Sequence, residues 1–305
     1  MTNTVMVTKR KGFMRFFVRN TIMAAIFLYP AASGASALIG GIEAGEGDFP
    51  EVVYIRSAIS ERTSVRCSAT IVGPRVILTA GHCVKDGGEI GPVSLKEIDF
   101  SLGQNLFKGT CKQAPEYRDK TEDLDLALCK VDKDIPVKWA SISRNSPKLS
   151  DIVTLLGYGC IKKGGGGGND GILRWGEAPV VKLPGGKDNW YHTKSSTTTL
   201  CSGDSGGPSY EQIKNPKSEH HWLQGVNSRG NLQDTSLLAA VFLEKSIKFF
   251  EDFAKSQNVD ICGINRECAG DDDGPKVCEK EISDLTSAVD KIKECLKVSQ
   301  LPYFE

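Results

Sequence analysis

Cys201-Ser202-Gly203-Asp204-Ser205-Gly206-Gly207-Pro208 is the most informative stretch of this 305-residue chain. Three glycines surround its second serine, an acid precedes that serine directly, and a proline ends the run. Glycine permits tight backbone geometry and close approach by another group. A serine hydroxyl presented on such a loop can act as a nucleophile when a base lies beside it. The stretch therefore predicts a nucleophile at Ser205 and requires a base elsewhere in the chain.

Two earlier segments offer the side chains that activate a serine. Leu78-Thr79-Ala80-Gly81-His82-Cys83 contains a histidine, which can take a proton near neutral pH. Asp123-Leu124-Asp125-Leu126-Ala127-Leu128 places acids among apolar residues, where a carboxylate is costly to bury unless it is paired. We expect this acid to lie on a strand and to orient the histidine.

Taken together, these segments resemble the trypsin/chymotrypsin-like serine proteases. Residues 203–208 are similar to the family's G-D-S-G-G-P, and residues 79–83 to its T-A-A-H-C, with Gly81 in place of the second alanine. The family's acid is followed by an aliphatic residue, a small or apolar residue and leucine, which favours Asp125 over Asp123. The resemblance covers Leu38 to about Asn258 and implies a catalytic triad of His82, Asp125 and Ser205.

The resemblance also implies the fold and the reaction. The expected fold is all-β, with two packed six-stranded antiparallel β-barrels, a C-terminal helix, and a cysteine-rich, partly helical tail. The expected activity is that of a secreted serine endopeptidase, which hydrolyses peptide bonds through an acyl-enzyme without a cofactor or metal. The backbone N–H groups of Gly203 and Ser205 would form the oxyanion hole. The alternative is a catalytically silent homologue that acts as a secreted binding protein.

Composition limits the class of partner. Lys and Arg together number 38, as do Asp and Glu, so the formal net charge is zero. This balance gives no argument for nucleic acid or for acidic surfaces. With 40% hydrophobic residues the chain can bury a core. The family resemblance implies a protein or peptide substrate, and we expect a monomer.

The first 37 residues predict export. A basic region precedes the mostly apolar residues 21–32, and Ala35-Ser36-Ala37 matches the A-x-A cleavage pattern of a signal peptide. An uncleaved anchor is the alternative, although the apolar run is short for a membrane span. We expect a secreted or periplasmic protein with no membrane attachment once the signal is removed.

Cleavage after Ala37 would expose Leu38-Ile39-Gly40-Gly41, which is similar to the family's mature terminus I-V-G-G. By the resemblance, the freed α-amino group of Leu38 would pair with Asp204 and hold the oxyanion-binding loop in shape. Signal peptidase would then create the active terminus directly. Cleavage after Ser33 is the competing hypothesis, and it would leave a four-residue pro-peptide.

The positions that match the family's substrate pocket contain no acid. An acid six residues before the nucleophile selects Lys or Arg in the family, and Thr199 stands there in this chain. We therefore expect cleavage after small to medium apolar residues rather than after Lys or Arg. Arg229 replaces a usual tryptophan beside the pocket. The pocket positions are Thr199, Leu200, Ser228, Gly230 and Ser236.

Ten cysteines in an exported chain indicate disulfides. The resemblance implies the pair Cys67–Cys83, and we also expect Cys111–Cys129 and Cys160–Cys201. No C-x-x-C motif is present, and Asp271-Asp272-Asp273-Gly274 lacks the full EF-hand pattern, so we predict no metal site.

The predicted domains are the signal peptide, 1–37, the protease domain, 38–258, and an extension, 259–305. The extension holds four cysteines that would pair among themselves: Cys262, Cys268, Cys278 and Cys295.

The extension also carries an apolar pattern at helical spacing, at Ile282, Leu285, Val289, Ile292 and Leu296. Such a face must be buried. Packing against the protease domain and binding of a partner both remain open.

Overall fold

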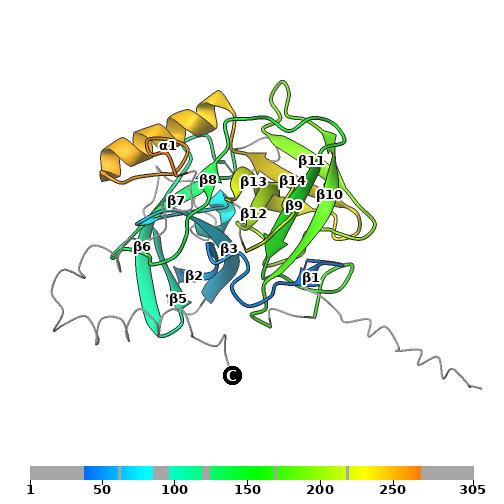
Figure 1. Ribbon diagram of the computed structural model, residues 1–305, viewed down its shortest axis with the longest axis horizontal. Helices are drawn as coiled ribbons and strands as arrows, with labels where there is room; N and C mark the ends of the chain where they lie inside the picture. The colour runs from blue at the N-terminus through cyan, green and yellow to red at the C-terminus, as the bar shows by residue number, and fades with distance from the viewer. Residues whose placement is uncertain are drawn as a thin grey trace, which may run out of the picture. The chain divides into compact units, whose positions relative to one another are not determined.

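The computed structural model describes residues 38–60, 63–84, 96–118, 124–167, 170–217 and 220–268. The predicted signal peptide, Asp123 and the tail after Cys268 lie outside these ranges. Strands dominate the described residues, and a single α-helix follows the last strand (Figure 1). The prediction of an all-β fold with a C-terminal helix is confirmed.

Six antiparallel strands form the first barrel. Their order is β2-β3-β4-β7-β6-β5, and pairing of Arg56 on β2 with Asp99 on β5 closes the ring. β-branched and leucine side chains such as Ile71, Ile77 and Leu128 are fully buried, as expected for strands that pack around a core. The strands are β2 (Val52–Ser60), β3 (Thr63–Gly73), β4 (Val76–Thr79), β5 (Lys96–Leu102), β6 (Asn105–Gln113) and β7 (Ala127–Val131).

The second barrel is a ring of six strands with two additions. The ring runs β9-β10-β11-β14-β13-β12 and closes because β9 pairs with both β10 and β12. The ring strands are β9 (Ile152–Gly157), β10 (Arg174–Lys182), β11 (Trp190–Lys194), β12 (Pro208–Glu211), β13 (Trp222–Gly230) and β14 (Thr235–Ala240). Two short strands, β1 (Ile42–Glu43) and β8 (Ser141–Ile142), join β10 and β13. The prediction of two six-stranded barrels is confirmed.

One local prediction needs correction, and the structure adds detail at two other places. Residues 96–102 and 105–113 are β5 and β6, which form a hairpin that turns at Gly103, whose φ is 55°. Asp125 was expected on a strand, but it lies two residues before β7 begins. No strand was expected at β11, although Trp190 and Tyr191 are fully buried in the second barrel.

The C-terminal helix and the residues after it pack on the barrels. Helix α1 (Glu244–Gln257) buries Ile247, Phe250 and Phe253, the three residues whose spacing predicts its inner face. The Cys262 N–H then donates to Val72 O at 2.8 Å. Residues 259–268 are therefore attached to the barrels. Within the described ranges, no helix combines the length and the apolar character needed to span a bilayer.

Candidate active site

The first barrel provides a histidine and an acid in direct contact. His82 lies on a short 3-10 helix, η1 (Gly81–Val84), which follows β4, and Asp125 precedes β7, the neighbour of β4. His82 Nδ1 is 2.7 Å from Asp125 Oδ2, and the His82 backbone N–H donates to Asp125 Oδ1 at 2.9 Å. Asp125 therefore holds both the ring and the main chain of His82.

The environment of Asp125 keeps it ionised. Asp125 is fully buried, and burial by itself would raise the pKa of its carboxyl. The adjacent His82 and the hydrogen bonds from His82 and the Ser228 hydroxyl outweigh burial, and they lower the pKa of Asp125 to about 2. An ionised Asp125 accepts the Nδ1 proton of His82, which leaves the lone pair of this imidazole on Nε2.

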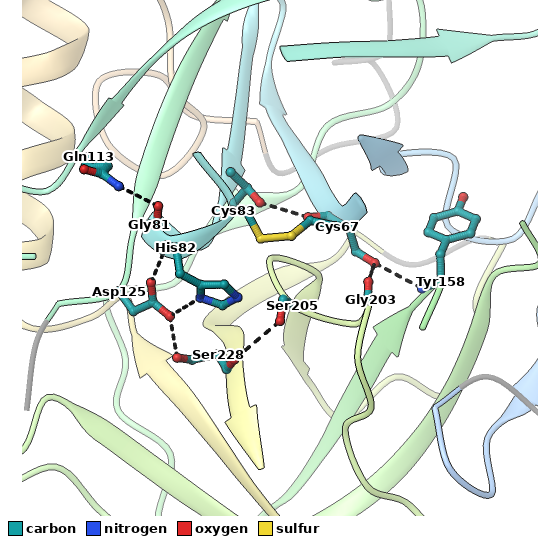
Figure 2. The surroundings of a disulfide bond; sticks show 12 residues. Cys67, Gly81, His82, Cys83, Gln113, Asp125, Tyr158, Gly203, Ser205 and Ser228 are labelled. Atoms are coloured by element: carbon teal, nitrogen blue, oxygen red, sulfur yellow. Dashed lines mark hydrogen bonds and ion pairs between the residues drawn. A yellow bond between two sulfur atoms is a disulfide. The ribbon is translucent and has the colours of Figure 1, made fainter. Parts of the chain in front are cut away.

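The second barrel provides the serine. Ser205 is half-buried on the loop before β12, and its hydroxyl lies 3.5 Å from the carbonyl oxygen of Ser228 on β13. Figure 2 shows the imidazole of His82 between Asp125 and Ser205. The predicted triad residues therefore come together from both barrels, and an imidazole beside a serine can serve as its base.

Close contacts leave no room for a side chain at position 206 of the serine loop. Gly206 has a φ of 84°, and a Cβ there would lie 2.1 Å from Thr79 Oγ1 and 2.2 Å from Ser68 O. The Gly206 N–H donates to Asn227 O at 2.8 Å, and the Gly207 N–H donates to Asp204 O at 3.0 Å. These bonds fix the backbone of the loop, and the contacts that a Cβ would meet at position 206 explain why a glycine follows Ser205.

Asp204 is a second buried acid, with a different environment. Its carboxylate accepts N–H bonds from Gly159 at 2.8 Å and from Cys201 at 2.7 Å. Burial raises the pKa of Asp204 to about 7, although these two bonds and the charge of Arg174 oppose the rise. Its predicted partner Leu38 is buried in the core of the second barrel.

The predicted pocket positions lie around the base of the serine loop. Thr199 is buried and donates its hydroxyl to Ser195 O at 3.2 Å. The Leu200 side chain packs in the core of the second barrel, and its N–H donates to Ser236 Oγ at 3.1 Å. Ser228 differs from the others because its hydroxyl is directed to Asp125.

Disulfides brace the same region. Bonded pairs join Cys67 to Cys83 beside His82, and Cys160 to Cys201 beside Asp204. A third joins Cys111 to Cys129, which face each other across β6 and β7. The tail contributes the pair Cys262–Cys268, whereas Cys278 and Cys295 lie outside the described residues.

Cys67, His82 and Cys83 also cluster closely enough to suggest a metal site. Both cysteines are in a disulfide, so they offer no thiolate, and His82 Nδ1 is already bonded to Asp125. This cluster therefore does not fit a metal ion.

Sequence reasoning missed several residues that shape the site. The Gln113 side chain donates to Gly81 O at 2.7 Å and supports the histidine segment. Ser68 contacts the serine loop although 135 positions separate it from Gly203. Neither residue lies in a motif that would have drawn attention to it.

Comparison with known proteins supports one family. The family model described as Trypsin matches residues 38–246. The chain is 26% identical over 185 residues to serine protease SP24D of Anopheles gambiae, which covers 56% of this chain and 66%, just under two thirds, of that protein. It is 24% identical over 282 residues to a trypsin-like protease of Streptomyces glaucescens, which covers 84% of this chain and 98% of that protein.

A trypsin of Simulium vittatum is 23% identical over 218 residues, which cover 61% of this chain and 83% of the fly protein. The family match spans both barrels and every residue of the candidate triad. This chain belongs to the trypsin family of serine proteases.

Proposed function

We propose that the protein is an exported serine endopeptidase in which Ser205, His82 and Asp125 act as nucleophile, base and orienting acid. The observation that carries this proposal is the buried, ionised Asp125 bonded to both the ring and the backbone of His82, next to Ser205. Burying a carboxylate is costly, so a histidine without a catalytic role is not expected to have a buried acid as its partner. This arrangement is the one that a serine nucleophile requires.

In the proposed reaction the neutral His82 ring carries its proton on Nδ1, toward Asp125, so Nε2 is the atom that takes the proton of Ser205. Ser205 Oγ attacks the carbonyl carbon of the substrate peptide, and its proton passes to His82 Nε2. Asp125 stabilises the positive imidazolium that forms. The tetrahedral intermediate then expels the amine, which takes the proton from His82. Water attacks the resulting ester with His82 again as base, so that the acid product leaves and Ser205 regains its proton.

The developing oxyanion needs donors, and Gly203 and Ser205 are the candidates. Their backbone N–H groups donate no hydrogen bond to other described residues, whereas those of Asp204, Gly206 and Gly207 all do. Two uncommitted N–H groups on one tight turn suit an anion that appears only during the reaction. Removal of one such donor typically costs about 2.7–4 kcal/mol of transition-state stabilisation.

We propose that the enzyme cleaves after small to medium apolar residues. None of Thr199, Leu200 and Ser236 carries a charge, and all three are buried. A Lys or Arg side chain would lose its hydration there without gaining a counter-charge. A peptide library read by mass spectrometry tests this proposal: most cuts should follow Ala, Val or similar residues, and predominant cuts after Arg would contradict it.

The proposed activation uses the buried acid of the serine loop. Burial raises the pKa of Asp204 although its backbone N–H bonds and the charge of Arg174 oppose the rise, and an α-amino group at Leu38 would add a cation that stabilises the charged form. Sequencing the terminus of the secreted or periplasmic protein tests the site of cleavage. Leu38 at the terminus would support direct activation by signal peptidase, and Gly34 would show that a second cut is needed.

The main test measures the intact mass of the exported protein before and after a fluorophosphonate probe. Wild type should gain one adduct, whereas Ser205→Ala should gain none. No adduct on a chain that begins at Leu38 would contradict the proposed enzymatic activity and favour the alternative of a catalytically silent homologue. No adduct on a longer chain would identify an unactivated precursor.

A further inference from the structure

Ser68, on β3 of the first barrel, contacts both residues that are proposed to bind the oxyanion. Its hydroxyl donates to Gly203 O at 2.9 Å, and its backbone N–H donates to Ser205 O at 2.8 Å. Ser68 itself is fully buried. We propose that Ser68 is a positioning residue that sets the oxyanion-binding geometry of the serine loop. This inference rests on the proposed protease function and adds a residue to its machinery.

Two hydrogen-bond partners determine the orientation of the Ser68 hydroxyl. It accepts the N–H of Tyr158 at 3.0 Å, and an N–H can only donate. The proton of the hydroxyl is therefore free to point at Gly203 O, which can only accept. Tyr158 and Gly203 thus share the oxygen of Ser68, and Figure 2 shows the two residues close together beside Cys67.

The peptide after Gly203 is consequently held at both ends. Its carbonyl accepts from Ser68, and its N–H, which belongs to Asp204, donates to Cys201 O at 3.0 Å. Gly203 has a φ of 103°, a region that glycine enters freely, so its own conformation is not restricted by a side chain. The Gly203 N–H, which is the proposed donor, belongs to the preceding peptide and is joined to this one through the Gly203 Cα. Without the Ser68 hydroxyl, rotation about the bonds of this flexible Cα is less restrained, and the direction of the Gly203 N–H would change.

The peptide after Ser205 is held in the same way. Its carbonyl accepts the Ser68 N–H, and its N–H, which belongs to Gly206, donates to Asn227 O at 2.8 Å. One residue of the first barrel thus fixes two peptides on a loop of the second. Preorganised donors stabilise an oxyanion because they need no rearrangement during the reaction. Loss of the hydroxyl should therefore affect the transition state more than substrate binding.

Ser68→Ala tests this, with Ser57→Ala as the matched control. Ser57 is also a buried serine of the first barrel, but its hydroxyl bonds to no described residue. Kinetics with a peptide p-nitroanilide are expressed per titrated active site, which removes the effect of misfolded protein. Ser68→Ala should lower kcat about tenfold or more with KM within twofold, and Ser57→Ala should leave both unchanged.

A peptidyl boronic acid provides a second readout, because its adduct with Ser205 places an oxygen where the oxyanion forms. Its inhibition constant should rise by the same factor as kcat falls in Ser68→Ala. A kcat within twofold of wild type, or a change in KM alone, would overturn the role of Ser68. Wild type that neither reacts with fluorophosphonate nor cleaves peptides would instead refute the proposed function, before any variant is compared.

Discussion

The Ser228 hydroxyl and the ring of His82 both bond to one oxygen of Asp125, Oδ2. Ser228 comes from the second barrel and His82 from the first, so Asp125 lies where the two barrels meet. A buried carboxylate with two donors on one oxygen is held more firmly than either donor could hold it alone. The orientation of His82 therefore depends on a residue of the opposite barrel.

Ser228→Ala should lower kcat/KM about tenfold, because a hydrogen bond to a charged group contributes about 1.5–3 kcal/mol and part of it is felt in the transition state. The pKa of Asp125 should rise, since a donor to the charged form is lost. Ser228→Thr keeps a hydroxyl and should recover most of the activity. Equal losses in both variants would show that the hydrogen bond is not the cause.

Asp125→Asn should reduce kcat by about 10⁴-fold while the fold persists, because an amide can present an N–H to His82 and favour the wrong tautomer. Asp123→Asn is the matched control, two positions earlier in the same segment. It should stay within twofold of wild type. Steady-state kinetics on both variants decide which aspartate belongs to the triad, and the reverse result would assign the role to Asp123.

The acid next to the nucleophile predicts a pH dependence of stability in the uncut chain. The pKa of Asp204 is raised from 3.8 to about 7, so between these values the folded state binds more protons than the unfolded state. Stability from this group is therefore complete below about pH 4 and declines as the pH rises to about 7. Urea unfolding of Ser205→Ala, with and without Asp204→Asn, should show this decline only when Asp204 is present.

The chain that begins at Leu38 gives the contrasting result. Its α-amino group would stabilise the charged form of Asp204, so the decline should disappear. A decline of the same size in the cut and uncut chains would argue against the ion pair.

Gly159→Ala should destabilise the protein by about 1–3 kcal/mol and reduce activity, because a Cβ would lie 2.6 Å from the backbone nitrogen of Asp204. Gly185→Ala is the control, since a Cβ there would contact nothing within 4 Å. Thermal unfolding should separate the two variants clearly. A Gly159→Ala variant as stable as Gly185→Ala would show that the Asp204 loop is more adaptable than its contacts indicate.

The amino-acid sequence alone identified the family, the two barrels and the residues of the candidate triad. Short stretches of sequence are enough to indicate these features: motifs surround His82, Asp125 and Ser205, and runs of β-branched residues mark most strands. The spacing of Ile247, Phe250 and Phe253 likewise predicted the inner face of α1. Strand β11, which pairs with β10 and β14, escaped prediction because its five residues, Trp190–Lys194, include a histidine and a lysine and contain no run of β-branched side chains.

Only the tertiary structure decided how the site is held. The bond from Ser68 to Gly203 spans 135 positions and depends on how β3 meets a loop of the other barrel. The opposite pKa shifts of Asp125 and Asp204 also have no signature in sequence, because both acids are fully buried. They differ because His82 lies beside Asp125, whereas Asp204 in the uncut chain has mainly backbone N–H partners.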